Sequence, residues 1–561
     1  MATSDVEQSG LRWRIWPWRK RKSAEVLLPA LAEYRSLDRH PLRNFLGASA
    51  LMLFLLLYGF FFSAFVPSYF AFFMMPLIAL GLLVIWALPN VDWAPTRSLE
   101  IFFYALFVGL IVWPNYLALS LPGLPWITLI RLTSFPLNLI LLACLSMSAE
   151  FRAVLMRSLR SIPAIPILLA IFVLIQFLSI GISKTPSDSI QKFIVAQTTW
   201  TALFFVSAYV FRRPNQFKRW AMIMWAMAIF VSFIAIVEAR VGHVLWLGHI
   251  PAILKINDDA VQAILAGNMR AYTDIYRSQA TFSTSLGLAE YLALTLPFIL
   301  HFVTRQFSSR IRIAALMSLP VVLYACVLTN SKLGTIGSLV GILLYIFGAS
   351  FRNWRRNKHS LISASFLLSY PLLLGLVGAA MLFSHRVSVL ILGNDGSHAA
   401  STQARIEQYT IGWHKFLQWP FGYGIGMAAT TLGFGEDRGG LTIDTYYLSV
   451  LLEYGIAGFI VYYGMFAIAI FEAGRRSLFG TLETEDRTFM LPIAVSLVVF
   501  IIIKSVFSQQ DNHPVVFMML GGLMALAASH RRAPNRARVA AKPATGLQRL
   551  SQTKTFAIAG R

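Results

Sequence analysis

Two carboxylates stand at or inside an apolar segment late in the chain. Asp444 comes immediately before the segment, and Glu453 follows about two and a half helical turns later. A carboxylate at that depth of a membrane is costly unless it is paired or faces a wet cavity, so Glu453 is a candidate site residue. The alternatives are structural. Asp444 could cap the following helix, and Glu453 could be a buried partner of Arg405 or Arg277.

Two arginines accompany these carboxylates. Arg277 lies in the run Tyr276–Phe282, and Arg405 lies in Ser401–Trp413, where apolar residues recur at helical spacing and predict an amphipathic loop helix capped by Ser401 or Thr402. Arginine binds phosphate in a bidentate manner and stays charged, and a nearby carboxylate can accept a proton from a sugar hydroxyl. Together these residue types suit a diphosphate-linked substrate. The alternatives are a snorkelling Arg277 and an ion pair of Arg405 with Glu407 or Asp444.

Other kinds of site have little support in the sequence. The ten histidines include no i, i+4 pair and no HExxH motif, and Cys144 and Cys326 lie in apolar segments, where we expect them to pack in the core. The run Phe421–Gly426 has no preceding strand and no following Lys-Ser/Thr, so it predicts a tight turn and not a nucleotide loop. We therefore expect no metal and no cofactor.

The elements that must position these residues are membrane helices. Of 561 residues, 57% are hydrophobic and 13% are charged, whereas soluble domains carry about 25% charged residues. The apolar residues form runs of about 20, the length that crosses a bilayer as a helix. We predict an all-α polytopic membrane protein with about fourteen spans, near residues 45–66, 69–89, 101–121, 126–148, 162–183, 193–211, 220–241, 284–304, 313–330, 334–350, 361–384, 445–473, 491–507 and 515–530.

The distribution of Lys and Arg predicts the orientation. The net charge is +23, and most positive residues fall in the tails and in alternate loops, so both termini should be cytoplasmic and no nucleic-acid partner is expected. A basic tail (1–44) that can rest on lipid headgroups precedes the transmembrane domain (45–530), and a second basic tail (531–561) follows it. Two outward-facing loops are long, 242–283 and 385–443, and loops of this length are usually functional.

From about 275 to 475 the chain resembles the O-antigen ligase/polymerase superfamily, bacterial membrane glycosyltransferases that act on undecaprenyl-diphosphate-linked glycans. The resemblance implies a GT-C-like arrangement with the active site on the periplasmic face of the inner membrane. No single motif is specific, but their order and spacing are. The segments that carry it are Arg277–Leu292, Thr329–Gly334, Ala404–Trp413, Pro420–Gly424 and Asp444–Gly455.

Carried over to this sequence, the resemblance implies a role for each residue. The catalytic His of the family falls at Asp444, which could still act as the base, with Glu453 as the reserve. The residues implied to hold the donor diphosphate are Arg277, Arg405 and Lys332, and those implied to support the site are Glu290, Tyr447 and Trp413.

The function predicted from this resemblance is a metal-independent polymerase of lipid-linked repeat units, making O-antigen, capsule or exopolysaccharide. Its partners would be an undecaprenyl-diphosphate-linked donor and acceptor, membrane lipid and a possible chain-length regulator. The replacement of His by Asp favours a polymerase over a ligase that transfers glycan to lipid A-core or protein. A transporter or flippase of lipid-linked sugars is the alternative from another class, although the polar residues crowd one face and do not gather at the membrane midplane.

Overall fold

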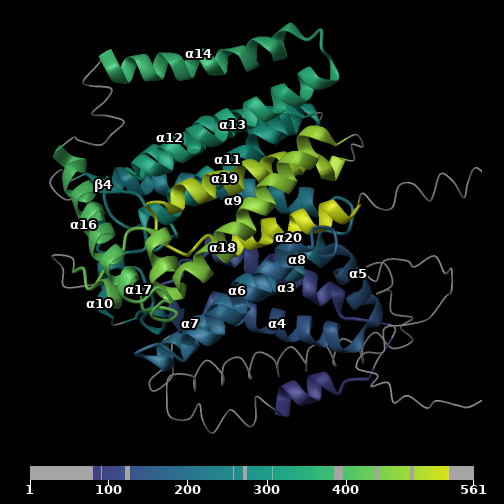
Figure 1. The fold of residues 1–561 in the computed structure, drawn as a ribbon, viewed down its shortest axis with the longest axis vertical. Coiled ribbons are helices and arrows are strands. Elements are labelled where there is room, and N and C mark those ends of the chain that lie inside the picture. The colour runs from purple at the N-terminus through teal and green to yellow at the C-terminus, as the bar shows by residue number, and fades with distance from the viewer. Residues whose placement is uncertain are drawn as a thin grey trace, which may run out of the picture.

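The computed structural model describes residues 80–529, apart from gaps at 90, 92, 120–126, 257, 270–274, 306, 384–395, 436–440 and 481–484. The predicted tails, the span 45–66 and most of the span 69–89 lie outside the described residues. The described residues form a bundle of helices (Figure 1). The strands within the described residues form two short antiparallel pairs. These are β1 (Ala118–Leu119) with β2 (Ile127–Thr128) and β3 (Asn268–Met269) with β4 (Tyr276–Arg277).

The helices of the bundle follow the predicted apolar runs. Among the described residues, eight helices are long and apolar enough to cross a membrane, or up to nine if α5 and α6, bent by 102°, form one span. An all-α polytopic membrane protein is therefore confirmed, and the total of fourteen spans stays a prediction. The α-helices described in the bundle, including those too short to count as spans, are α3 (Thr96–Val112), α4 (Leu129–Met147), α5 (Ala149–Leu159), α6 (Ala164–Ile180), α7 (Pro186–Ala196), α8 (Ala202–Val210), α9 (Gln216–Val241), α11 (Ser285–Thr304), α12 (Ser309–Leu328), α13 (Lys332–Arg356), α14 (Leu361–Phe383), α18 (Tyr446–Phe479), α19 (Met490–Lys504) and α20 (His513–Ser529).

Both long loops contain helices. The first holds η2 (Ala252–Leu254) and α10 (Asp259–Leu265), and the second holds α16 (Gly396–Gln418) and α17 (Ala428–Leu432). The predicted amphipathic loop helix is confirmed as α16. The predicted caps are wrong, because α16 begins at Gly396 and Ser401 and Thr402 lie inside it.

The core lies around α11, of which nearly every residue is buried. Aromatic rings of Phe217, Trp220 and Phe298 pack together at its side. Small residues allow other helices to approach closely, as membrane helices commonly do: Gly521 of α20 lies against the backbone and side chains of α8, where an added Cβ would collide. Cys144 and Cys326 are buried, as expected.

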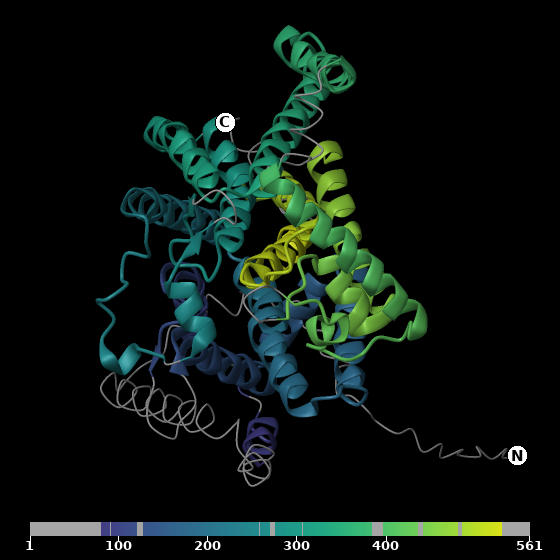
Figure 2. The same cartoon turned by 90° about the vertical axis from the view of Figure 1, so that its left-hand side faces the viewer.

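We name the two ends of the bundle by what they carry. The site end is the end of the bundle where α11, α13, α18 and α20 begin and α19 ends. The opposite end is where α11, α13, α18 and α20 end and α19 begins. Figure 2 looks onto the site end, with α16 crossing in front of the helix ends.

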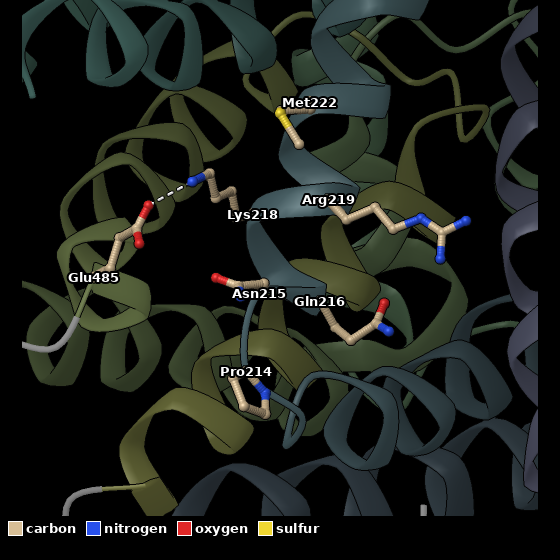
Figure 3. Close-up of a pocket in the computed structure, with 7 residues that line it drawn as sticks. All are labelled: Pro214, Asn215, Gln216, Lys218, Arg219, Met222 and Glu485. Carbon is tan, nitrogen blue, oxygen red and sulfur yellow. Dashed lines mark hydrogen bonds and ion pairs between the residues drawn. The ribbon is translucent and has the colours of Figure 1, made fainter. Parts of the chain in front are cut away.

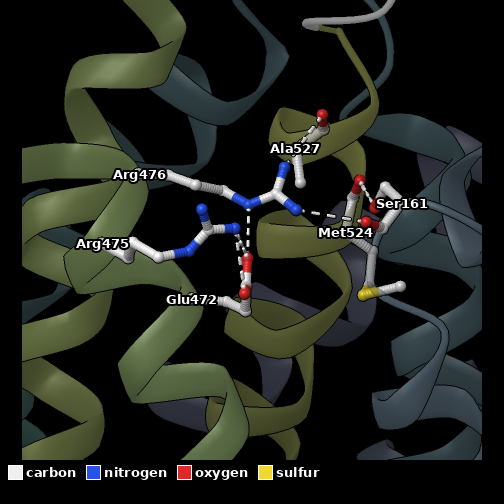
Figure 4. A network of polar contacts seen from close by, with 6 residues as sticks. All are labelled: Ser161, Glu472, Arg475, Arg476, Met524 and Ala527. Atoms are coloured by element: carbon white, nitrogen blue, oxygen red, sulfur yellow. Dashed lines mark hydrogen bonds and ion pairs between the residues drawn. The ribbon is translucent and has the colours of Figure 1, made fainter. Parts of the chain in front are cut away.

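Charges at the opposite end are used in ion pairs. Glu472 accepts from Arg475 (2.9 Å) and Arg476 (2.8 Å), and Arg476 also donates to the carbonyl of Ser161 (3.2 Å), which joins α18 to the turn between α5 and α6 (Figure 4). A pocket of about 470 Å³ opens nearby at the start of α9, where Lys218 pairs with Glu485 at 2.6 Å (Figure 3). These contacts join neighbouring segments of the chain at the opposite end of the bundle.

Candidate active site

Asp444 lies one residue before the cap of α18. The hydroxyl of Thr445 accepts the N–H of Leu448 and is the N-cap, so the alternative that Asp444 caps this helix is wrong. The backbone N–H of Asp444 donates to the side-chain carbonyl of Gln408 at 2.8 Å, and Gln408 is fully buried. The backbone of Asp444 is thus fixed by α16, while its carboxylate is not needed to cap the helix.

The carboxylate of Asp444 faces Arg405. Arg405 Nε lies 4.0 Å from Asp444 Oδ2, and the two side chains are 31% and 32% exposed. Burial raises the pKa of Asp444 above its usual value, and the nearby guanidinium of Arg405 opposes that rise. Of the two ion pairs considered for Arg405, the structure contains the one with Asp444. A carboxylate and a guanidinium therefore meet where solvent or a ligand can reach both.

Arg277 lies beside the turn between α12 and α13. Its Nε donates to the carbonyl of Thr329 at 3.2 Å, and Asn330 turns the chain with a φ of 48°. Ser331 then caps α13 by accepting the N–H of Gly334 at 3.1 Å. Lys332 is the first residue of α13, and its Nζ is buried and makes no hydrogen bond within the described part of the chain. Two segments far apart in sequence thus bring two cations to one turn.

Residues 505–512, which we call the bridging segment, contact both α16 and the start of α11. The Tyr409 hydroxyl of α16 lies 3.5 Å from the carbonyl of Ser505. At the other end of the segment, Asp511 accepts from the Ser283 hydroxyl at 2.8 Å, and Asn512 donates to the carbonyl of Gly287 at 2.9 Å. The bridging segment therefore links α16 to the start of α11.

A buried ion pair anchors the bridging segment. Lys504 Nζ lies 2.9 Å from the carboxylate of Glu290, and both side chains are 0% exposed. Asn512 donates to the same carboxylate at 3.2 Å, and Lys504 also donates to the carbonyl of Gln509. Glu290, predicted to support the site, is fully buried and contacts Lys504 and Asn512, and its role in the site stays a prediction.

The glycine-rich run packs across a break in α18. Gly455 has a φ of 65° and interrupts the helix, which would leave backbone groups unpaired inside the membrane. Tyr423 and Gly424 donate their N–H groups to the carbonyls of Leu452 (2.8 Å) and Glu453 (3.0 Å), and Ile456 donates to Pro420 (3.1 Å). Gly422 has a φ of 92°, and a Cβ there would lie 2.6 Å from the backbone of Glu453. The predicted tight turn is confirmed.

Glu453 lies directly beneath this turn. Its side chain is buried and interacts with the ammonium of Lys192 and with the backbone N–H groups of Gly426 and Ala428. Lys192 in turn donates to the carbonyl of Gly426 at 3.1 Å. The alternative that Glu453 pairs with Arg405 or Arg277 is therefore wrong, because its cationic partner comes from α7.

Part of the chain is similar to a known family. Residues 313–463 match the family model described as O-Antigen ligase. This match supports the resemblance to the O-antigen ligase/polymerase superfamily and does not distinguish a polymerase from a ligase. No curated protein matches the chain. The family match covers Lys332, Arg405, Asp444 and Glu453, and it begins after Arg277 and Glu290.

Two predicted supporting residues, Tyr447 and Trp413, lie near the site end without touching the Arg405–Asp444 pair in any described contact. The Tyr447 hydroxyl donates to the carbonyl of Ile501 at 2.7 Å and so joins α18 to α19. Trp413 of α16 is 53% exposed and packs on the ring of Phe416, at 5.2 Å between centroids.

Two positioning residues, Gln408 and Glu238, were not identified from the sequence alone. Gln408, which holds the backbone of Asp444, lies one helical turn after Arg405, and that spacing could have revealed it. Glu238 of α9 accepts the Tyr276 hydroxyl at 2.5 Å and the N–H of Ala280 at 2.6 Å, and so fixes the segment around Arg277. An isolated carboxylate near the end of an apolar run is the signal that could have identified it.

The described residues hold no group of three or more His, Cys, Asp or Glu side chains arranged to bind a metal ion. The side chains gathered at the site end are instead those that bind anions and transfer protons.

Proposed function

We propose that the protein is a glycosyltransferase that polymerises oligosaccharide repeat units linked to undecaprenyl diphosphate, with Asp444 as the general base. One observation carries the proposal. Asp444 does not cap α18, its carboxylate is partly exposed, and it lies 4.0 Å from the Arg405 guanidinium. A carboxylate with a raised pKa is a better proton acceptor than an ordinary one, which suits a general base.

In the proposed reaction, a sugar hydroxyl of the acceptor attacks the anomeric carbon of the donor. The new bond joins the acceptor oxygen to that carbon, and the bond between the carbon and the diphosphate oxygen breaks. The hydroxyl proton moves to Asp444, and the electron pair of the broken bond leaves on the lipid diphosphate. Negative charge grows on that leaving group, so a cation placed there lowers the barrier.

The cations available for the leaving group are Arg405, Arg277 and Lys332. Arg405 borders Asp444, and the other two flank the turn between α12 and α13. A buried ammonium without a hydrogen-bond partner is costly, and a phosphate oxygen would relieve that cost at Lys332. Glu453 is the reserve base in this proposal, although its contacts with Lys192 and the glycine-rich run leave Asp444 the better candidate.

A ligase that transfers the glycan to lipid A-core or protein is the second candidate, because the matching family model is described as O-Antigen ligase. The Asp at position 444, where ligases of the superfamily carry His, favours the polymerase. In either case we place the reaction on the periplasmic face of a bacterial inner membrane, with both termini cytoplasmic. A chain-length regulator is a proposed further partner.

The test is reconstitution of the purified protein with lipid-diphosphate repeat units, beside Asp444→Asn. We expect a ladder of multiples with the wild type and single repeat units with the variant. Gln403→Asn, a conservative change on an exposed position of α16, is the matched control and should keep the ladder.

Other outcomes separate the alternatives. A product seen only after lipid A-core is added would establish the ligase and overturn the polymerase. Movement of the substrate across the bilayer without new bonds would favour a transporter. A full ladder from Asp444→Asn would exclude Asp444 as the base.

A further inference from the structure

Helix α16 has three distinct faces, and within the described part of the chain one of them is buried against the protein. Gln408, Gly412 and Phe416 are buried on that face. A Cβ on Gly412 would lie 2.6 Å from the side chain of Leu448, which shows how closely α16 approaches α18. Phe416 joins a small apolar cluster with residues of α17 and α18.

The second face is apolar but exposed. Ile406, Tyr409, Trp413 and Leu417 recur at intervals of three or four residues, and they are 54%, 41%, 53% and 61% exposed. We call these four residues the apolar stripe. The third face is also exposed but polar, and it consists of Gln403, Glu407, Thr410 and His414. Two more exposed rings, Trp419 and Phe421, follow the end of the helix.

The apolar stripe lies at the level where the membrane helices end. Its Tyr409 hydroxyl is 3.5 Å from the carbonyl of Ser505, the residue that follows the last residue of α19. Figures 1 and 2 show α16 crossing the ends of the long helices and not running parallel to them. A helix in this position lies in the plane of the membrane surface, where tryptophan and tyrosine are enriched.

The exposure of the apolar stripe is comparable to, or lower than, that of large apolar side chains on membrane-type helices of the bundle. Phe177 of α6, Met317 of α12 and Leu368 of α14 are 59%, 67% and 73% exposed, and all three belong to apolar helices of the bundle. A stripe of this kind on a helix with one polar face is the pattern of an interfacial amphipathic helix.

We infer that the apolar stripe of α16 is a membrane-docking surface, buried among the acyl chains of the leaflet at the site end. Arg405 precedes Ile406 and borders the apolar stripe. Docking would therefore hold the Arg405–Asp444 pair at the depth of the lipid headgroups. The inference rests on the membrane position of the chain and not on the proposed reaction.

The experiment is spin labelling of single cysteines in proteoliposomes of phosphatidylethanolamine and phosphatidylglycerol. Ile406→Cys, Trp413→Cys and Leu417→Cys report on the apolar stripe, and Gln403→Cys, Thr410→Cys and His414→Cys on the polar face are matched controls. The native Cys144 and Cys326 are 0% and 1% exposed, so unsubstituted protein should take no label. Power saturation then compares collision with oxygen, which concentrates in lipid, and with a water-soluble nickel complex.

Labels on the apolar stripe should collide mainly with oxygen, and labels on the polar face mainly with the nickel complex. Equal access of the nickel complex to both faces would overturn the inference. Labels shielded from both reagents would mean that a second copy of the chain covers the stripe, which also overturns it. Oxygen access that arises only after a polyprenyl diphosphate is added would identify the substrate chain as the occupant in place of the leaflet.

Discussion

The two ends of the bundle use their charges differently. At the opposite end, Glu472 and Glu100 each hold two arginines at 2.8–3.4 Å, and Lys218 lies 2.6 Å from Glu485. At the site end, Arg405 and Asp444 are 4.0 Å apart, and Lys332 Nζ makes no hydrogen bond within the described residues. These arginines and Lys218 at the opposite end lie in close ion pairs, whereas Arg405 at the site end faces Asp444 at a longer distance.

The largest effect should come from the base. Asp444→Asn removes the proton acceptor and should lower the polymerisation rate by about 10²–10⁴-fold. Asp444→Glu keeps a carboxylate and should retain part of the activity. The measurement is the initial rate in proteoliposomes at saturating donor. An unchanged rate with Asp444→Asn would remove the functional distinction between the ends.

The buried ion pair at the site end should have the largest effect on stability. Lys504→Met leaves the Glu290 carboxylate buried without its ammonium, which costs about 3–5 kcal/mol. The double variant Glu290→Gln/Lys504→Met should recover much of this loss, because no lone charge remains. Thermal unfolding of the purified protein in detergent compares the variants. If the single and double variants melt alike, the two side chains are not coupled.

The next largest loss of rate is expected when Arg405, the cation beside the proposed base, is substituted. Arg405→Ala should slow turnover by about 10²-fold, since one charge contact to the leaving diphosphate is lost. Arg405→Lys keeps the charge but not the bidentate geometry, so its rate should lie between that of the wild type and that of Arg405→Ala. Arg219→Ala at the opposite end is the control and should leave the rate unchanged.

A smaller effect is expected on the pH profile. In the proposed reaction Asp444 must be ionised to accept the proton, so the rate should fall as the pH drops through its raised pKa. Arg405 favours the ionised form, and Arg405→Gln should therefore raise this pKa and move the acid limb of the profile to higher pH. The rate is measured against pH for both proteins. An acid limb that stays in place would argue against their electrostatic coupling.

The smallest effect should be at the opposite end. Glu472→Gln weakens contacts with Arg475, which is 53% exposed, and Arg476, and should cost at most about 1 kcal/mol of unfolding free energy. Its polymerisation rate should match the wild type. A loss of activity comparable to that of Arg405→Ala would show that both ends serve the reaction.

The helices could be predicted from the sequence because their apolar runs are long and unambiguous. Even α16 was predictable, since Ile406, Tyr409 and Trp413 recur at helical spacing. Its start was not, because the residues before Ser401 carry no distinct capping pattern. The break in α18 was also missed, since a single glycine within an apolar run does not reveal a change in φ.

The residue types at the candidate site could be predicted, but their partners could not. Asp444 and Arg405 were identified by charge and position, and their pairing was one of two alternatives. The partners of Glu290 and Glu453 were missed, because Lys504 and Lys192 lie 214 and 261 positions away from them in sequence. Spacing along one helix says nothing about contacts between helices so far apart in the chain.

The break at Gly455 has a consequence for how the protein is made. The backbone groups that it exposes are paired by residues 420–424, which leave the ribosome before α18 does. The turn can thus be delivered across the membrane first and wait there for the broken helix. If residues 420–424 were deleted, the carbonyls of Leu452 and Glu453 and the N–H of Ile456 would lose these partners at the break in α18.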